Sequence, residues 1–335
     1  MGQGTGIRAV AVLGGLLMLL AGASGSALAQ GAKVRIGGSV SPPAMDTIVL
    51  YVAREEGFFK QAGLDVQLLD FRGDATHTKA FLAGELEVMG EIGASSGIVS
   101  ATKVPGFRAY YVLSQVTPYF FVARAPVAKV SELAGKSIAV SGLGAISHHI
   151  PRVILERAGV DPDQARYISL GSPADRFKAL VAGKVEATLI APTEAVLLGR
   201  YPEIRVLVRT PEALPEFPYE FSMARREWVD RNPEAMAGVV KGLIQAARFS
   251  ARNKEGVVKV AVKVTRQDAD LLAKSYDLFP RGHWSVNGEL DRRAYQYTAD
   301  LMVKVGYMKT AVPYEEFFDR RFVDRALQEL GRWKE

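Results

Sequence analysis

Apolar runs of strand length alternate with helical patterns along this chain, and they do so twice. In the first half, residues 34–38, 66–71 and 88–92 form such runs, and in the second half residues 137–141, 167–170 and 187–190 do. Helical patterns separate the runs, beginning near Asp46 in the first half and covering 147–158 in the second. Strands that alternate with helices predict parallel sheets covered by helices, so the expected fold class is α/β with two similar lobes.

An internal repeat supports this division. Residues 79–87 (KAFLAGELE) recur as residues 178–186 (KALVAGKVE), at a constant offset of 99 residues. Five of the nine positions are identical, and three others exchange one apolar residue for another. Each copy predicts the end of a helix, a glycine cap at Gly84 or Gly183, and then a short strand. The repeat therefore predicts the same helix–turn–strand unit in each lobe.

The loops that follow the predicted strands are the expected binding region, because ligands of open parallel sheets lie outside the carboxyl ends of the strands. These loops are residues 39–45, 72–78, 93–97, 142–147 and 191–194. Each leads into a predicted helix, whose first backbone N–H groups have no partner within the helix. If the lobes face each other, the loops converge on one cleft.

The remainder of the chain is predicted to be helical. Asn232, Pro233 and Glu234 form a typical helix start, and apolar residues follow at helical spacing. Further helices are expected at residues 267–276, 290–305 and 314–330. We interpret their apolar faces as parts of the core.

The amino terminus has the pattern of a secretory signal peptide: Arg8, an apolar stretch over residues 9–23, and small residues ending at Ala29. We expect residues 1–29 to be cleaved and the remainder to be a soluble protein of the periplasm. The sequence has no cysteine, which excludes disulfides, thiolate nucleophiles and iron–sulfur clusters. The net charge of +6 is spread over interspersed acids and bases, so nucleic acid is not an expected partner.

With these elements placed, the sequence resembles the periplasmic substrate-binding proteins of nitrate/sulfonate/taurine-type ABC importers, a group that includes thiamine-pyrimidine-precursor binding proteins. The resemblance is carried by residues 51–66 (YVAREEGFFKQAGLDV), the two Ala-Gly-x-x-Glu segments, residues 133–140 and residues 317–319. This chain has Glu87 and Glu186 where the family usually has aspartate, and Ala191-Pro192 where the family often has a Glu-Pro pair.

The resemblance implies a two-lobed periplasmic-binding-protein type II fold, in which two crossing segments join two parallel-sheet α/β lobes. Lobe I would comprise residues 30–116 and 221–335, and lobe II residues 117–220, with the crossings near 114–121 and 217–223. The implied function is capture of a small organic solute (a sulfonate, a carboxylate or a pyrimidine-like compound) between the lobes, without catalysis. ABC permease subunits at the inner membrane would receive the solute. No cofactor or metal is implied, and a monomer is expected.

Candidate ligand-binding residues lie in the predicted loops and crossings. They are Ser41, Met45, Asp74, Ser95, Ser96, Thr117, Tyr119, Gly144, Ser147, His148, Thr193, Glu194 and Tyr219. Hydroxyl groups would hydrogen-bond the solute, and the two tyrosines, with Trp284, form either an aromatic wall or core packing. The acids Asp46, Asp74 and Glu194 would favour an amine-bearing solute such as taurine over nitrate if they cluster, although each alone is equally a helix cap.

Residues 93–97 (GASSG) fit the G-x-S-x-G nucleophile elbow, so a secreted serine esterase that uses Ser95 is the alternative function. That chemistry needs a histidine base, and no His-Gly-Gly oxyanion loop precedes the serine. The histidines of the chain are His77, His148, His149 and His283. Residues 142–147 lack the third glycine of a dinucleotide fingerprint. Adjacent histidines diverge on a helix, so the pair at 148–149 does not predict a metal site.

Overall fold

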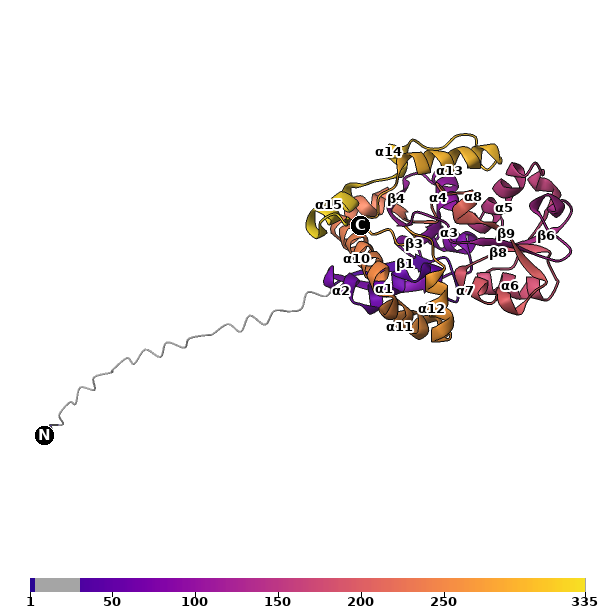
Figure 1. Ribbon diagram of the computed structural model, residues 1–335. Coiled ribbons are helices and arrows are strands. Elements are labelled where there is room, and N and C mark those ends of the chain that lie inside the picture. The colour runs from indigo at the N-terminus through magenta and orange to yellow at the C-terminus, as the bar shows by residue number, and fades with distance from the viewer. Residues whose placement is uncertain (4–30, 335) are drawn as a thin grey trace. The chain divides into compact units, whose positions relative to one another are not determined.

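The computed structural model describes residues 1–3 and 31–334 (Figure 1). The chain divides into two units, Met1–Gln30 and Gly31–Glu335, and the helices and strands described below belong to the second. The predicted signal peptide, residues 1–29, lies outside the described residues except for its first three. Among the described residues, none of the helices has both the length and the apolar character needed to cross a membrane.

Two five-stranded sheets form the centres of two lobes. Sheet A has the strand order β2-β1-β3-β10-β4, and sheet B has the order β7-β6-β8-β5-β9. The strands of sheet A are β1 (Ala32–Gly38), β2 (Leu64–Asp70), β3 (Val88–Gly93), β4 (Phe107–Ser114) and β10 (Glu220–Arg225). The strands of sheet B are β5 (Phe120–Arg124), β6 (Ser137–Val140), β7 (Arg166–Ser169), β8 (Ala187–Ile190) and β9 (Ile204–Arg209). We call the parts built on sheets A and B lobe I and lobe II; the predicted two-lobed α/β fold is confirmed.

Each sheet is mixed rather than wholly parallel, which differs from the expectation. In sheet A, β1 is parallel to β2 and β3, whereas β10 is antiparallel to β3 and β4. In sheet B, β6 is parallel to β7 and β8, whereas β5 is antiparallel to β8 and β9. The two antiparallel strands directly follow the segments in which the chain changes lobe: β5 follows residues 115–119, and β10 follows residues 210–219. Because the chain enters each new sheet at the edge where the parallel strands end, its first strand there runs the opposite way.

The internal repeat is present in the fold. The helices α3 (Asp74–Leu82) and α6 (Pro173–Val181) begin and end at positions related by the same 99-residue offset as the repeated sequences. Each is followed by a glycine with positive φ, 77° at Gly84 and 67° at Gly183, a conformation that glycine adopts without steric cost. The predicted glycine caps are therefore confirmed in both lobes.

The repeated glutamates also have matching roles. The Glu87 carboxylate accepts a hydrogen bond from the backbone N–H of Arg35 in β1 at 2.8 Å. The Glu186 carboxylate accepts the equivalent bond from the backbone N–H of Ser137 in β6 at 2.7 Å. Glutamate in place of the family's aspartate therefore ties the end of the turn to the neighbouring strand in each lobe.

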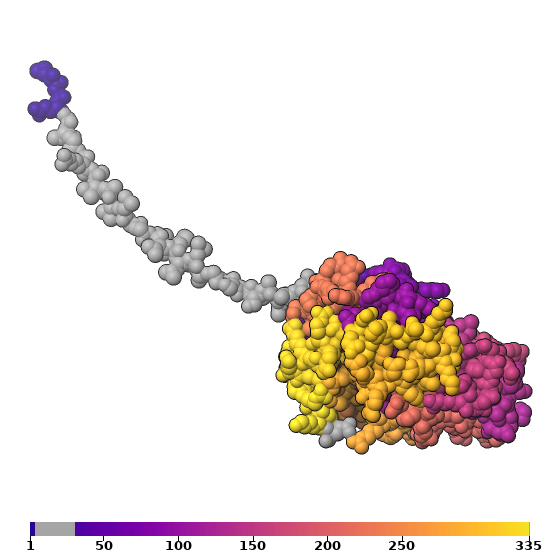
Figure 2. Space-filling model, turned by 90° about the horizontal axis from the view of Figure 1, so that it is seen from above, coloured from indigo at the N-terminus to yellow at the C-terminus, as the bar shows by residue number. Residues whose placement is uncertain are grey.

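Helices cover both sheets (Figure 1). Those of lobe I are η1 (Met45–Thr47), α1 (Val49–Glu55), α2 (Phe58–Gln61), α3, α4 (Ala94–Ala101), α9 (Arg226–Arg231), α10 (Pro233–Arg252), α11 (Lys254–Thr265), α12 (Ala269–Asp277), α13 (Arg292–Lys304), α14 (Tyr314–Phe317) and α15 (Arg321–Leu330). Lobe II has η2 (Val130–Leu133), α5 (Ile146–Arg157), η3 (Pro162–Gln164), α6, α7 (Pro192–Val196) and η4 (Leu198–Arg200), and α8 (Thr210–Ala213) lies in the return crossing. The helix α10 contacts α1, α2 and α15, so the last part of the chain packs on lobe I. Figure 2 shows the C-terminal residues in yellow beside orange and purple elements.

The prediction of one helix over residues 314–330 is wrong, because α14 and α15 are separate. Between them, Phe318 forms a β-bridge with Ala109 of the edge strand β4, and the Asp319 N–H donates to the Ala109 carbonyl at 2.9 Å. Pairing with a strand requires extended backbone, and Phe318 has φ −111° and ψ 117°. The sheet edge therefore interrupts the helix. The helices α12 and α13 lie at the other two predicted positions.

Candidate functional site

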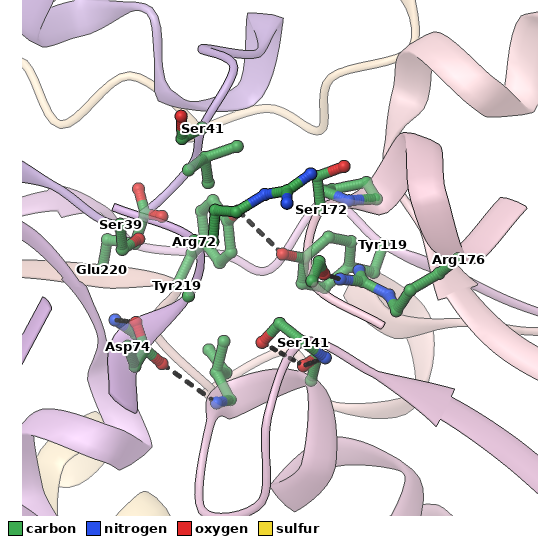
Figure 3. Close-up of a pocket in the computed structure, with 17 residues that line it drawn as sticks. Ser39, Ser41, Arg72, Asp74, Tyr119, Ser141, Ser172, Arg176, Tyr219 and Glu220 are labelled. Atoms are coloured by element: carbon green, nitrogen blue, oxygen red, sulfur yellow. Dashed lines mark hydrogen bonds between the residues drawn. The ribbon is translucent and has the colours of Figure 1, made fainter. Parts of the chain in front are cut away.

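A small cavity lies where the carboxyl ends of the parallel strands of both lobes meet (Figure 3). Its volume is ≈ 30 Å³, which holds only about one or two water molecules. Lobe I lines it with Ser39, Val40, Ser41, Arg72, Gly73, Asp74, Gly93 and Glu220, and lobe II with Ser141, Ile146, Ser147, Gly171, Ser172, Pro173 and Arg176. Tyr119 and Tyr219 line it from the two crossings. Loops from both sheets and both crossings therefore converge on one cavity.

The two tyrosines occupy equivalent positions, each directly before the antiparallel strand of a sheet. Their rings are in edge contact with centroids 5.2 Å apart, and their hydroxyl oxygens lie 2.9 Å apart. The Tyr219 hydroxyl donates to the Asp46 carboxylate at 2.6 Å. Because that donation uses the single hydroxyl proton of Tyr219, the Tyr119 hydroxyl must donate to Tyr219. Burial raises the pKa of both tyrosines, so both hydroxyls keep their protons near neutral pH.

Asp74, at the start of α3, connects the two lobes. Its Oδ1 accepts from the backbone N–H of Gly93 at 3.3 Å, and its Oδ2 accepts from the Ser96 hydroxyl at 2.6 Å. The same Oδ2 accepts from the backbone N–H of Ile146, in lobe II, at 3.2 Å. The Ser96 hydroxyl also lies 3.3 Å from the carbonyl oxygen of Gly144 in lobe II. These bonds join the first turns of α3 and α4 to the first turn of α5.

Buried carboxyl groups surround the cavity. They are Asp46, Asp74, Glu91 and Glu220 from lobe I and Glu194 from lobe II, all at most 7 % exposed. Burial and the charges of neighbouring acids raise the pKa of Glu91 and of Glu220 well above the usual range. Burial raises the pKa of Asp46 and, with the charge of Asp46, raises that of Glu194 to about 7. In the described part of the chain, no three His, Cys, Asp or Glu side chains are grouped so that they could hold a metal ion.

Arg176, from the first turn of α6, brings a buried positive charge to this region. Its side chain is 1 % exposed and donates to the carbonyl oxygens of Gly171 at 2.7 Å and of Leu189 at 3.1 Å. These carbonyls orient the guanidinium, yet no carboxylate of the described residues forms an ion pair with it. Arg72, by contrast, is largely exposed and pairs with Asp175 of lobe II at 3.3 Å.

The structure distributes the candidate residues between the cavity and its surroundings. Ser41, Asp74, Tyr119, Ser147 and Tyr219 line the cavity, whereas Met45, Ser95, Ser96, Thr117, Gly144, His148, Thr193 and Glu194 do not. Some of the latter join the lobes: Thr193 Oγ1 lies 2.9 Å from Ser275 Oγ of α12, and His148 Nδ1 lies 2.7 Å from the Tyr307 hydroxyl. The Glu194 carboxylate accepts from the Ala191 N–H at the start of α7 at 3.2 Å. A role in ligand binding stays a prediction for each candidate.

Several cavity residues were not among the candidates, namely Ser39, Arg72, Ser141, Ser172, Arg176 and Glu220. The repeat contained a signal for part of this set. The 99-residue offset maps residues 72–74, in the loop after β2, onto residues 171–173 after β7, and both segments line the cavity. The 99-residue offset, extended upstream of the repeated segments, therefore predicts residues 171–173 as a second loop of the binding region.

Ser95, the candidate nucleophile of the esterase alternative, faces a histidine but not the cavity. Its hydroxyl lies 2.8 Å from His149 Nδ1, and both residues are fully buried. The other ring nitrogen, Nε2, has no hydrogen-bond partner among the described residues, so the acid that would orient the base is missing from this pair. Burial also lowers the pKa of His149 well below its usual value. The geometry therefore gives a buried contact between α4 and α5 rather than a serine triad.

The raised pKa of Glu194 leads to a prediction about stability. A carboxyl that titrates near 7 in the folded state and near 4.5 when unfolded contributes its full stability below 4.5 and loses it as the pH rises to 7. Relative to the wild type, Glu194→Gln is therefore expected to gain about 3 kcal/mol of unfolding free energy between pH 4.5 and pH 8. Chemical denaturation at both pH values measures this difference.

Glu186→Gln is the matched control for Glu194→Gln. Burial acts to raise the pKa of Glu186, but the hydrogen bonds from Ser137 outweigh it and leave the pKa lowered. The wild type therefore gains stability from Glu186 as the pH rises, and the control should change in the opposite direction. Equal pH dependence in the two variants would contradict the assignment of Glu194 to the acid cluster.

Comparison with known proteins gives a family and a fold. A family model described as NMT1/THI5 like matches residues 44–256. The protein YtlA of Bacillus subtilis (strain 168) is 22% identical over 291 residues, which cover 84% of this chain and 86% of YtlA.

Two solved structures share the fold. The alkanesulfonate-binding protein SsuA from Xanthomonas axonopodis pv. citri, bound to MOPS, has a TM-score of 0.69 at 18% identity and covers 89% of this chain and 98% of its own. The periplasmic nitrate-binding protein NrtA from Synechocystis PCC 6803 has a TM-score of 0.73 at 15% identity and covers 90% of this chain and 89% of its own. The architecture described above is therefore that of these binding proteins.

Proposed function

Since the chain belongs to the NMT1/THI5-like family, we propose that it is the solute-binding protein of an ABC importer and not an enzyme. It captures a small organic solute, of the sulfonate, carboxylate or pyrimidine-like classes, between its two lobes. The observation that carries the proposal is the polar cavity enclosed by the carboxyl ends of both sheets and by both crossings. Ligands of open α/β sheets bind at this place, and here two sheets supply it together.

The crossings provide the motion that such a receptor needs. The chain changes lobe through residues 115–119 and 210–219, and we propose these segments as the hinge. Contacts such as Asp74 to Ile146 then belong to a closed form, whose cavity of ≈ 30 Å³ is smaller than an organic solute. Rotation about the hinge opens the cavity, and the lobes close around a solute with a slightly wider spacing. A solute that bridges the lobes binds the closed form better and shifts the population toward it.

The cellular setting follows from the same proposal. Cleavage after Ala29 releases the protein into the periplasm as a monomer, where it meets its solute. The closed form then presents both lobes to ABC permease subunits at the inner membrane.

The test of the proposal is recovery of a solute from the protein itself. Protein purified from the periplasm under mild conditions is denatured, the released small molecules are identified by mass spectrometry, and each is titrated back by calorimetry. A small molecule that rebinds with one site per chain supports the proposal. Protein that carries no solute and binds none of a broad panel of sulfonates, carboxylates and pyrimidines contradicts it.

Replacement of Ser95 distinguishes the receptor from the esterase. We expect no turnover of chromogenic esters by either the wild type or Ser95→Ala. Because Ser95 does not line the cavity, the affinity for the recovered solute should stay within about twofold. The variant should lose about 1–3 kcal/mol of unfolding free energy, since His149 Nδ1 is then buried without its partner. Ester hydrolysis by the wild type that disappears in Ser95→Ala would contradict the receptor proposal.

A further inference from the structure

The two walls of the cavity differ in charge. Glu220 and Asp74 line the lobe I wall, at 3 % and 6 % exposure. Behind that wall, Asp46 Oδ1 and Glu91 Oε2 are buried carboxylate oxygens without a hydrogen-bond partner among the described residues. Arg176 stands in the lobe II wall, equally buried and without an ion pair there. Arg72 also lines the cavity from lobe I, but it is largely exposed and already paired with Asp175. Among the buried charged residues of the lining, the acids therefore belong to lobe I and the arginine to lobe II.

The hydrogen bonds on the acidic side have a fixed direction. Tyr119 donates to Tyr219, and Tyr219 donates to Asp46, so both hydroxyl protons are already used. What remains toward the cavity is lone pairs on the tyrosine oxygens, together with the carboxylate of Glu220. Ser39, Ser41 and Arg72 on the same wall can donate, so the acceptors that are complementary to a group rich in N–H bonds are Glu220 and the two tyrosine oxygens.

We propose that the solute carries a basic nitrogen, a protonated amine or an amidine-type group as in an aminopyrimidine, which faces Glu220 and Tyr119. An anionic or hydrogen-bond-accepting group on the same solute faces Arg176. This inference rests on the proposed function and narrows its solute class: aminosulfonates, amino acids and aminopyrimidines fit, whereas nitrate and amine-free sulfonates leave the acidic wall unmatched. Buried charge is costly unless it is paired, and such a solute pairs both walls at once.

The titration of the acids agrees with this assignment. Burial and neighbouring acids raise the pKa of Glu220, so its carboxyl holds a proton more readily before the solute enters than afterwards. A cationic group that arrives beside it favours the carboxylate, and the proton leaves for the solvent. Binding of an amine-bearing solute should therefore release protons, which calorimetry in buffers of different ionisation enthalpy detects.

The experiment uses pairs of probes that differ in the basic nitrogen: taurine against isethionate, 3-aminopropanoate against propanoate, and 4-aminopyrimidine against pyrimidine, with nitrate added alone. We expect binding in at least one pair, with the nitrogen-bearing member at least tenfold tighter. Glu220→Gln should weaken that member at least tenfold and should reduce its proton release. Since Glu220→Gln removes one of several mutually repelling acids, the variant should unfold at or above the wild-type temperature.

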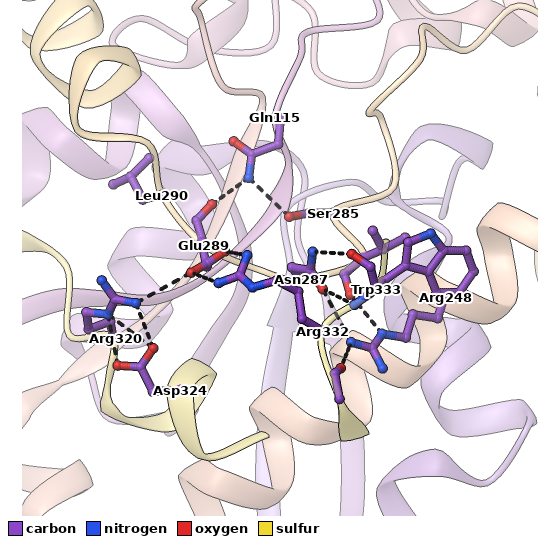
Figure 4. Close-up of polar contacts among 12 residues, drawn as sticks. Gln115, Arg248, Ser285, Asn287, Glu289, Leu290, Arg320, Asp324, Arg332 and Trp333 are labelled. Atoms are coloured by element: carbon purple, nitrogen blue, oxygen red, sulfur yellow. Dashed lines mark hydrogen bonds and ion pairs between the residues drawn. The ribbon is translucent and has the colours of Figure 1, made fainter. Parts of the chain in front are cut away.

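Glu289→Gln is the matched control, because Glu289 lies outside the cavity and pairs with Arg320 and Arg332 (Figure 4). Its affinity for every probe should equal that of the wild type. If the amine-free members bind as tightly, or the solute recovered from the periplasmic protein has no basic nitrogen, the inference is overturned and the proposed function stands. If no solute is recovered and no probe binds, the proposed function fails, and the inference with it.

Discussion

The double variant Ala75→Cys, Gly142→Cys is expected to form a disulfide that holds the two lobes together. Ala75 belongs to α3 of lobe I, and Gly142 follows β6 of lobe II. A Cβ built on Gly142 lies 3.7 Å from the Cβ of Ala75, within the range of about 3.5–4.5 Å found in disulfides. Because the chain has no cysteine of its own, no other disulfide competes.

The locked protein should keep the solute that it contains. After loading with the recovered solute and oxidation, we expect release to become too slow to measure, and a reducing agent should restore it. Either single cysteine variant is the control and should release the solute at the wild-type rate. A double variant that stays reduced under mild oxidation, or that releases solute normally when oxidised, would contradict a closed form in which these two positions touch.

Much of the fold could be predicted because its signals are local. The 99-residue repeat and the apolar runs located α3, α6, β3 and β8, since each depends on a helical period, a glycine turn and a strand next to it in sequence. The direction of β5 and β10 could not be predicted in this way. β10 pairs with β3 and β4, and β5 pairs with β8 and β9, which lie far away in the sequence. The local sequence pattern of a strand does not determine which distant strand it pairs with.

The candidate site was also predictable only in part: its loops follow from local patterns, but the directions of its side chains do not. The rule that ligands lie at the carboxyl ends of strands located the loops, and Ser41, Asp74 and Ser147 in them do line the cavity. The rule does not say which way a side chain points within the first helical turn. Ser95 lies in the predicted loop 93–97, which forms the first turn of α4, yet its side chain points away from the cavity and packs against His149.

Arg176 illustrates a second reason for incomplete prediction. In the sequence, an arginine in an amphipathic helix is typical of an exposed face, and its near-complete burial depends on where α6 begins relative to the cavity. Asp46, Glu91 and Glu220 converge within lobe I because the chain returns to sheet A through β10, and Glu194 joins them only where the two lobes meet. A cluster of acids favours an amine-bearing solute, but these acids are far apart in the sequence and only the fold brings them together.

The second large effect is expected from Gly93→Ala, which should prevent full closure of the lobes and should shift only the Asp74 side chain within lobe I. Gly93 ends β3 in lobe I, with φ −49° and ψ 129°, a conformation that alanine also adopts. A Cβ built there lies 2.6 Å from the Cβ of Ile146 in lobe II and 2.9 Å from Asp74 Oδ2. The Asp74 carboxylate lies in the same lobe and can shift as the end of a flexible side chain. The Ile146 Cβ is attached to the backbone of lobe II, so this second clash is relieved by moving the lobes apart.

Lobes held apart lose the contact between Asp74 and the Ile146 N–H, and the bound solute then bridges a wider cavity. We expect the affinity for the recovered solute to fall at least tenfold, which is about 1.4 kcal/mol, while the thermal unfolding of the solute-free protein changes little. Calorimetry measures the affinity, and small-angle scattering should show less contraction on solute addition than in the wild type.

Gly142→Ala is the control for Gly93→Ala, because it adds the same methyl group at the contact between the lobes without a clash. It lies on the same contact between the lobes, but a Cβ there meets Ala75 at 3.7 Å, an ordinary van der Waals distance. Both substitutions add one methyl group at a glycine without positive φ. They differ in the room available and in that Gly93, unlike Gly142, lines the cavity. We therefore expect Gly142→Ala to bind the solute like the wild type. Equal affinity in Gly93→Ala and Gly142→Ala would mean that the solute-bound form does not bring Gly93 against Ile146.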